Sequence, residues 1–290
     1  MNKPLFTGVC TALVTPFLYD KINYPMLQQL IERQIKAGIQ AIVIAGTTGE
    51  SPTLSDSEKI ELFCKCKEFA GDRCLVIAGT GSNDTVHAVR LSKAAQQAGA
   101  DALLVVSPYY NKATPGGLIS HYMSIANSAD IPIILYNVPS RTGVDIPVSV
   151  YQRLSLVEHI TGVKEASPDI TKVTKIRRLC HPNFCVWSGN DDQTVPALSL
   201  GAKGVISVLS NVCPEETVVM TQSALNGDYQ TASALQCRLS ELIDLLFCEV
   251  NPIPVKAAMQ MIGYDCGSCR LPLSQLTPES YEKLKAYFRA

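Results

Sequence analysis

Short apolar runs rich in β-branched residues alternate with longer amphipathic segments along most of the chain. Each run has the length and composition of a β-strand that is buried on both faces. We predict strands at residues 8–13, 41–45, 75–78, 102–106, 133–136, 160–163, 185–187 and 205–208. The segments between them have the spacing of amphipathic helices, which we predict at residues 26–36, 56–69, 85–98, 117–128, 148–154, 170–179 and 194–200.

This alternation predicts an α/β protein with a parallel sheet that is covered by helices. Eight strand-helix repeats close naturally into a (β/α)8 TIM barrel, and a doubly wound open sheet is the alternative. Local signals support the boundaries of the elements. Ser55 and Glu58 have the spacing of a capping box, and Gly38 and Gly99 stand where helices should stop.

The pattern changes after the eighth predicted strand, because only helical segments follow. A long helix is predicted at residues 229–247 and a last one at residues 278–288. A barrel alone does not need all of these helices. We therefore expect a barrel core in residues 1–215, and C-terminal helices in residues 216–290 that complete the barrel and form a helical appendage.

Charge and hydropathy limit the partners of the protein. The 290 residues are 47% hydrophobic and 18% charged, the formal net charge is −1, and the chain has no block of Lys and Arg. This argues against nucleic acid or an anionic membrane surface as the main partner and favours a small-molecule substrate. The chain has neither a signal-peptide pattern nor an apolar run of about 18 residues, so a cytoplasmic location is expected.

Cysteine and histidine positions give little support to a metal or redox site. Most of the eleven cysteines have no paired spacing, so we expect reduced core thiols. Cys266 and Cys269 have the spacing of a redox dithiol or half a zinc site, but their place near the C-terminus favours a loop with two free thiols. The four histidines are dispersed. We expect no metal and no cofactor.

Lys164 stands where the sixth apolar run ends, and its only close acidic neighbour in the sequence is Glu165. A buried ammonium loses hydration, which favours the neutral amine, the form that attacks a carbonyl group. A strand-end lysine that extends to solvent is the alternative, and for Lys164 taken alone it is the better interpretation.

The residues after other strands change that interpretation, because active sites of barrels lie at the carboxyl ends of the strands. Thr47 and Thr48, flanked by glycines, can hold a carboxylate with backbone N–H groups and hydroxyls. Tyr136 shares a strand face with the barrel interior and can relay protons. Arg141 offers a bidentate fork for a second carboxylate. Together with Lys164, these residues predict a metal-free class I aldolase.

The chain resembles the dihydrodipicolinate synthase and N-acetylneuraminate lyase superfamily over essentially its whole length. The matching motifs are GTTGES at residues 46–51, PYY at 108–110, YNVPSRT at 136–142, GVKEAS at 162–167, SGNDD at 188–192, GVIS at 204–207 and NPIPVK at 251–256.

The resemblance implies a role for each matching residue. Lys164 would form a Schiff base with pyruvate, whose carboxylate Thr47 and Thr48 would hold, and Gly189 and Ile206 would line the pyruvate pocket. Tyr136 would relay protons through Thr48 to Tyr110, which in this family reaches the neighbouring subunit. Arg141 would bind the carboxylate of L-aspartate 4-semialdehyde. A homotetramer built from two tight dimers is expected, acting in lysine and diaminopimelate biosynthesis.

The choice of aldehyde depends on fewer residues. Sialic acid lyases share Lys164 and Tyr136, whereas Arg141 and residues 251–254 are more typical of the synthases. N-acetylneuraminate lyase, or another pyruvate-dependent class I aldolase, is the alternative within the superfamily. A barrel that binds a keto acid without catalysis is an alternative of another class.

The resemblance also implies a regulatory site, because many synthases are inhibited by lysine in a cleft at the dimer interface. Ser51, Leu54, Asn83 and Tyr109 match positions around that cleft. Lys59 replaces a histidine of the lysine-sensitive bacterial enzymes, and His87 replaces a glutamate. An added cation and a lost carboxylate should weaken binding of the ligand's ammonium groups. We expect weak or absent inhibition by lysine.

Overall fold

The computed structural model describes residues 4–289, and it contains a closed barrel of eight parallel strands. Around the barrel the strands follow the chain order β1, β4, β5, β6, β7, β8, β9 and β10, and β10 pairs with β1 to complete the circle. Their bounds are Gly8–Ala12, Ala41–Ile44, Leu75–Gly79, Ala102–Val106, Ile133–Asn137, Ile160–Glu165, Cys185–Ser188 and Gly204–Ser207. The predicted TIM barrel is confirmed, and the open sheet is wrong.

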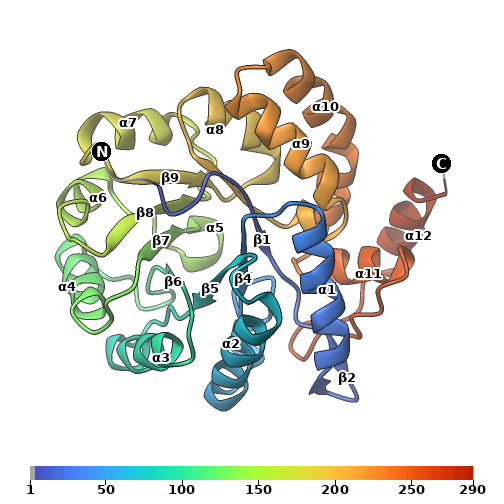
Figure 1. Ribbon diagram of the computed structural model, residues 1–290, viewed down its shortest axis with the longest axis horizontal. Coiled ribbons are helices and arrows are strands. Elements are labelled where there is room, and N and C mark those ends of the chain that lie inside the picture. The colour runs from blue at the N-terminus through green and yellow to red at the C-terminus, as the bar shows by residue number, and fades with distance from the viewer. Residues whose placement is uncertain (1–3, 290) are drawn as a thin grey trace.

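Helices between the strands surround the barrel (Figure 1). They are α1 (Tyr24–Lys36), α2 (Asp56–Ala70), α3 (Thr85–Gln97), α4 (Pro115–Ala126), α6 (Val148–Leu154), α7 (Thr171–Leu179), α8 (Thr194–Ser199) and α9 (Pro214–Leu225). The capping box predicted at Ser55 is present, because its hydroxyl accepts from Glu58 N–H while the Glu58 carboxylate accepts from Ser55 N–H. Sequence periodicity therefore located α1 to α4 and α6 to α8 to within a few residues, whereas no bounds were predicted for α9.

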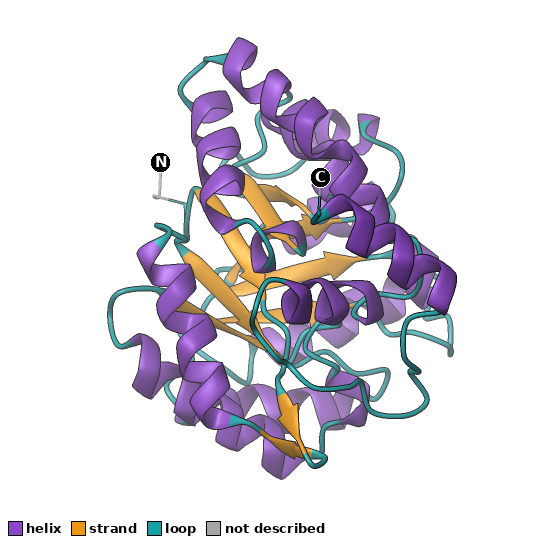
Figure 2. Ribbon diagram, turned by 90° about the vertical axis from the view of Figure 1, so that its right-hand side faces the viewer, coloured by secondary structure: helices purple, strands orange, loops and turns teal. Residues whose placement is uncertain are grey.

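Several short elements were not predicted, because they are too short to show a period. A two-stranded hairpin of β2 (Phe17–Leu18) and β3 (Lys21–Ile22) lies apart from the barrel strands (Figure 2). The four-residue helix α5 (Pro139–Thr142) follows β7. Three 3-10 turns, η1 (Ser51–Thr53), η2 (Asp191–Gln193) and η3 (Leu209–Asn211), follow β4, β9 and β10. All three turns and α5 lie in the segments that follow carboxyl ends of barrel strands, so they shape the face where a barrel carries its active site.

The C-terminal part is helical, as expected. Helix α9 packs on β1 and β10, which makes it the eighth helix of the barrel. Helices α10 (Tyr229–Leu246), α11 (Ile253–Met261) and α12 (Pro278–Tyr287) form the appendage, and α12 packs against α10 and α11 (Figure 1). The division of the chain at residue 215 stays a prediction. Within residues 4–289, no helix combines the length and apolar composition that crossing a bilayer requires.

Two hydrophobic cores result from the alternation of side chains along the strands. In β7, Ile133 and Leu135 pack toward the helices, whereas Ile134 and Tyr136 belong to the core inside the barrel. The predicted inward orientation of Tyr136 is therefore confirmed. The inner core also contains Cys10, Ala41, Val43, Ile77, Leu104, Trp187 and Ile206.

A buried ion pair joins the appendage to the loop after β4. Lys256 Nζ of α11 lies 2.6 Å from Glu50 Oε1, and the two side chains are 3% and 0% exposed. The second carboxylate oxygen, Glu50 Oε2, accepts from Arg270 N–H at 2.8 Å. Both carboxylate oxygens thus have donors from the C-terminal part of the chain, which holds the loop in place.

We predict that Lys256→Met lowers the free energy of unfolding by about 3–5 kcal/mol, because it leaves the Glu50 carboxylate buried without its counter-charge. The double variant Lys256→Met/Glu50→Gln should recover part of this loss. The matched control is Lys283→Met, which breaks an exposed pair with Glu279 and should cost less than about 1 kcal/mol. Denaturant unfolding measures all three, and equal losses in the two single variants would contradict the prediction.

Candidate active site

Strand β8 sends Lys164 and Glu165 to opposite faces. The Glu165 carboxylate accepts from Asn137 Nδ2 at 2.8 Å and from the Tyr151 hydroxyl at 3.1 Å, and it lies 3.8 Å from Lys172 Nζ. Burial and the Glu165 carboxylate raise the pKa of Tyr151, which therefore stays a hydrogen-bond donor. The Glu165 carboxylate thus bonds to these partners and does not neutralise the neighbouring Lys164.

Lys164 lies inside the barrel, with 5% of the residue exposed. Among residues 4–289 it makes no ion pair, and its Nζ lies 4.4 Å from the centre of the Tyr136 ring. Lys164 and Tyr136 are register partners on β8 and β7. The alternative of a lysine that extends to solvent is wrong. The predicted end of this strand at residue 163 is wrong, because β8 runs to Glu165. Lys164 is therefore a strand residue rather than the first residue after the strand.

Gly189 makes room for the Lys164 side chain. A Cβ atom at this position would lie 3.0 Å from Lys164 Cε and 2.6 Å from Ala166 Cβ, closer than packed carbon atoms approach. Ile206 is fully buried in the inner core. The structure therefore places Gly189 beside the Lys164 side chain and Ile206 inside the barrel.

The loop after β4 has an unusual backbone conformation. Ala45 and Glu50 have positive φ angles of 52° and 58°, which non-glycine residues rarely adopt. Within the loop Thr48 is buried, and its Oγ1 accepts from Asn251 Nδ2 at 3.0 Å. Because Asn251 donates this bond, the Thr48 hydroxyl keeps its own proton to donate elsewhere. Thr47 lines a cavity together with Tyr136.

Arg141 belongs to α5, directly after the strand that carries Tyr136. Its Nη2 donates to the backbone oxygen of Asn251 at 3.1 Å, and its side chain lines the same cavity as Thr47. Asn251 therefore contacts both the residue expected to bind the first substrate, Thr48, and the residue expected to bind the second. Sequence reasoning used Asn251 only as part of a motif and missed these contacts.

One cavity of about 270 Å³ contains predicted residues of both sites. Thr47, Tyr136 and Arg141 line it, and so do four of the six residues expected to be regulatory. Those four are Ser51, Lys59, His87 and Tyr109. Leu54 and Asn83 do not line it, and Leu54 is buried in the outer core. The cavity thus joins residues of both predicted sites, but Lys164 and Thr48 are not among the residues that line it.

Tyr110 is a predicted catalytic residue that does not line this cavity. It is 89% exposed with a positive φ of 71°, and within the described chain no hydrogen bond links it to Thr48 or Tyr136. Its side chain is therefore open to solvent in the single chain. A proton relay from Tyr136 through Thr48 to Tyr110 is therefore not formed within the single chain.

Asp191 is a buried acid near the site that sequence reasoning did not single out. Its Oδ2 accepts from the N–H groups of Val208 and Leu209, at 2.9 Å and 3.0 Å. Burial raises the pKa of Asp191, and the nearby positive charge of Lys164 opposes this rise. Asp191 and Asp192 follow the seventh predicted strand, and this pair of acids was the sequence signal from which Asp191 could have been predicted.

The Cys266–Cys269 spacing does not correspond to a reactive dithiol. Cys266 is buried, Cys269 is half-buried, and both thiols are free. Burial raises the pKa of each to about 12, whereas reactive thiols have a lowered pKa. The prediction of a loop with two free thiols is confirmed.

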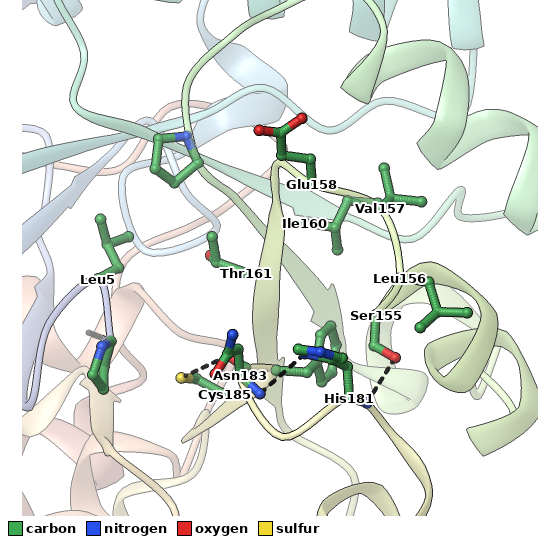
Figure 3. A pocket seen from close by; sticks show the side chains of 13 residues that line it. Leu5, Ser155, Leu156, Val157, Glu158, Ile160, Thr161, His181, Asn183 and Cys185 are labelled. Atoms are coloured by element: carbon green, nitrogen blue, oxygen red, sulfur yellow. Dashed lines mark hydrogen bonds between the residues drawn. The ribbon is translucent and has the colours of Figure 1, made fainter. Parts of the chain in front are cut away.

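A second cavity of about 490 Å³ opens at the other end of the barrel, beside the amino ends of β8 and β9 (Figure 3). His181, Asn183 and Ser155 line it and bond mainly to one another and to backbone groups. It contains none of the predicted catalytic residues. The cavity that Thr47, Tyr136 and Arg141 line is therefore the candidate active site.

Comparisons with known proteins show the family to which the chain belongs. A family model, described as the dihydrodipicolinate synthetase family, matches residues 5–290. A 4-hydroxy-tetrahydrodipicolinate synthase of Acetivibrio thermocellus is 48% identical over 98% of this chain and 97% of that protein. The relative of the same name from a Thermoanaerobacter species is also 48% identical, over 98% and 96% of the two chains.

A solved structure has nearly the same fold. The crystal structure of dihydrodipicolinate synthase from Aquifex aeolicus superposes with a TM-score of 0.96 at 44% identity, and the match covers 98% of this chain and 97% of the other. Both the barrel and the C-terminal helices therefore have counterparts in a known enzyme. The chain belongs to the dihydrodipicolinate synthetase family.

Proposed function

We propose that the protein is a class I aldolase-type lyase that condenses pyruvate with L-aspartate 4-semialdehyde to give 4-hydroxytetrahydrodipicolinate, in lysine and diaminopimelate biosynthesis. The observation that supports this proposal most strongly is the position of Lys164, a buried amine that has no ion-pair partner within residues 4–289 and lies beside the Tyr136 ring. Family membership supports the substrates, because the relatives carry the name of this synthase. The free state of all eleven cysteines fits a reducing compartment, which supports the cytoplasm.

In the first half of the reaction, the Lys164 amine attacks the keto carbon of pyruvate and forms a carbinolamine, which loses water to give a cationic imine. Thr47 and Thr48 would hold the pyruvate carboxylate at the end of β4. Tyr136 would deliver the proton that turns the carbinolamine hydroxyl into water. The positive imine then takes up the electron pair when a methyl proton leaves, and an enamine results.

In the second half, the enamine carbon attacks the aldehyde carbon of the semialdehyde, and the new alkoxide takes a proton. The substrate's amine then attacks the imine carbon, closes the ring and releases Lys164. Arg141 would pair with the substrate carboxylate, since Asn251 O engages only Nη2 and leaves other guanidinium donors free. The overall reaction releases one molecule of water for each pyruvate and semialdehyde that condense.

The choice of aldehyde is tested by comparing two acceptors. Arg141 suits a small acidic semialdehyde better than a polyhydroxylated sugar. We expect turnover of pyruvate with L-aspartate 4-semialdehyde and a much lower kcat/KM for pyruvate with N-acetylmannosamine. Preference for the sugar would support a sialic acid lyase. Turnover with neither acceptor, together with tight pyruvate binding, would support a keto-acid-binding barrel without catalysis.

The phenol of Tyr136 is predicted to act in proton transfer rather than in binding. Tyr136→Phe keeps the ring that packs beside Lys164 but removes the hydroxyl, so kcat should fall by roughly 100- to 10,000-fold with little change in the KM for pyruvate. Tyr229→Phe, at an exposed position on α10, is the matched control and should leave kcat unchanged. Wild-type kcat in Tyr136→Phe would refute the relay.

Tyr110 connects this relay to the assembly. We propose a homotetramer built from two dimers, in which the exposed Tyr110 side chain of one subunit reaches the Thr48 hydroxyl of the other. Tyr110→Phe should then lower kcat as Tyr136→Phe does, although by a smaller factor. Analytical ultracentrifugation at assay concentration checks the assembly, and a fully active monomer would contradict it.

Lysine is predicted to inhibit weakly or not at all. Lys59 and Arg141 are both cationic and line the joined cavity, and no Asp or Glu is among its lining residues. An ammonium ligand therefore meets repulsion without a compensating carboxylate. Initial rates at increasing lysine should stay nearly constant, and half-inhibition at submillimolar lysine would show that this account of the cavity is wrong.

A further inference from the structure

Asp191 is a buried acid to which the proposed reaction gives no role. It is the first residue of η2, the turn that follows β9, and 2% of the residue is exposed. The next residue, Asp192, is exposed to solvent. Burial of a carboxylate is costly unless donors or a cation stabilise its charge. The position of Asp191 inside the protein therefore needs an explanation that Asp192 does not.

Hydrogen bonds from other elements hold Asp191 in place. Its Oδ2 accepts from the N–H groups of Val208 and Leu209, which follow β10, at 2.9 Å and 3.0 Å. Its backbone oxygen accepts from Thr194 Oγ1 at 2.9 Å and from Gln236 Nε2 of α10 at 3.1 Å. The carboxylate thus bridges the segments after β9 and β10, on the face where a barrel carries its active site.

The second oxygen of this carboxylate has no such role. Asp191 Oδ1 is buried and has no hydrogen-bond partner among residues 4–289. The two N–H groups of Val208 and Leu209 share the other oxygen, and the carbonyl oxygen of an asparagine could accept from them equally well. The turn after β10 therefore needs an acceptor at residue 191, but it does not need a negative charge.

Lys164 is the cation that this charge can act on. Gly189, two residues before Asp191, lies against the Lys164 side chain, because a Cβ atom there would be 3.0 Å from Lys164 Cε. Burial is the largest influence on Asp191 and raises its pKa, and the positive charge of Lys164 acts in the opposite direction. The two groups form no ion pair, which requires an N–O distance of 4.0 Å or less. They therefore interact through space across the barrel mouth.

We propose that Asp191 acts on the reaction through Lys164, because its carboxylate stabilises the positive charge of the imine. The inference rests on the proposed Schiff-base reaction. The carbinolamine that precedes the imine is neutral at nitrogen, whereas the imine is cationic, so a fixed negative charge nearby favours the loss of water that forms the imine. Oδ1, which shares its charge with no donor of the described chain, is the oxygen that carries this effect.

Two thiols and a phenol are the other titratable groups that interact with this pair. Cys10 interacts with Lys164 and Cys213 with Asp191, and burial raises the pKa of both thiols, to about 12 for Cys213. Both thiols therefore stay neutral near pH 7. Tyr136 places its ring 4.4 Å from Lys164 Nζ. The charge of Asp191 is therefore the one expected to change as the solution becomes acidic.

Asp191→Asn removes the charge and keeps an acceptor for both N–H groups. Trapping of the intact protein with cyanoborohydride, over a range of pyruvate concentrations, measures imine formation. At pH 8 we expect the pyruvate concentration for a half-maximal trapping rate to rise about tenfold, the equivalent of one pKa unit. Asp191→Ser, which also keeps an acceptor without a charge, should show the same rise.

The pH dependence separates an electrostatic role from a structural one. As the pH falls through the pKa of Asp191, the wild type loses the negative charge, so its difference from Asp191→Asn should shrink. Because this pKa is raised, the difference should disappear at a higher pH than the titration of an ordinary carboxyl group. A loss that is the same at every pH would show a structural role and overturn the proposal.

The matched control is Asp192→Asn, which removes an exposed charge one residue away and should be trapped as the wild type is at every pH. Thermal unfolding without pyruvate checks that each variant is folded. Wild-type half-saturation at pH 8 in a folded Asp191→Asn or Asp191→Ser would overturn the proposal.

The same assay separates this proposal from the proposed reaction. If the wild type forms the adduct and the variants at Asp191 match it, only the role of Asp191 is wrong. If the wild type forms no pyruvate adduct at any pH, the Schiff-base reaction is wrong, and the role of Asp191 in it falls as well.

Discussion

The alternation of side chains along β8 is the constraint on which the rest of the site depends. Adjacent residues of a strand point to opposite faces, so Lys164 must enter the barrel if Glu165 is to reach its partners outside it. Asn137, Tyr151 and Lys172 hold Glu165 on that outer side. A shift of β8 by one residue would exchange the two charges and place a carboxylate inside the barrel. The network around Glu165 therefore fixes the position of the amine without contacting it.

The C-terminal appendage completes the site from the other direction. Its residues reach the loop after β4 through several contacts, among them the Lys256–Glu50 ion pair and the hydrogen bond from Asn251 to Thr48. The loop needs such anchors, because Ala45 and Glu50 have backbone conformations that are unfavourable for non-glycine residues. The C-terminal part of the chain thus helps to position the Thr48 hydroxyl. Asn251 contacts both Thr48 and Arg141 and so links the two residues.

Much of the fold and part of the site could be predicted from the sequence. Strand and helix positions follow from local periodicity, and the rule that barrel sites lie at strand ends selected Thr47, Thr48, Arg141 and Lys164. The Asn251–Thr48 contact joins residues 203 positions apart, and the Lys256–Glu50 bond joins residues 206 apart, so no local pattern could reveal them. The presence of residues from both predicted sites in one cavity also depends on how side chains fill the barrel mouth. The exposure of Tyr110 is another such feature, since it depends on how the loop after β6 leaves the barrel.

Reductive trapping with borohydride tests the central claim most directly, because it detects the bond that Lys164 is proposed to form. Intact-protein mass spectrometry after treatment with pyruvate and borohydride should show one adduct per chain, with the mass of a reduced pyruvate imine. Peptide mapping should place it on Lys164, and Lys164→Ala should show none. The same mass in the wild type with and without pyruvate, or an undiminished adduct in Lys164→Ala, would contradict the account.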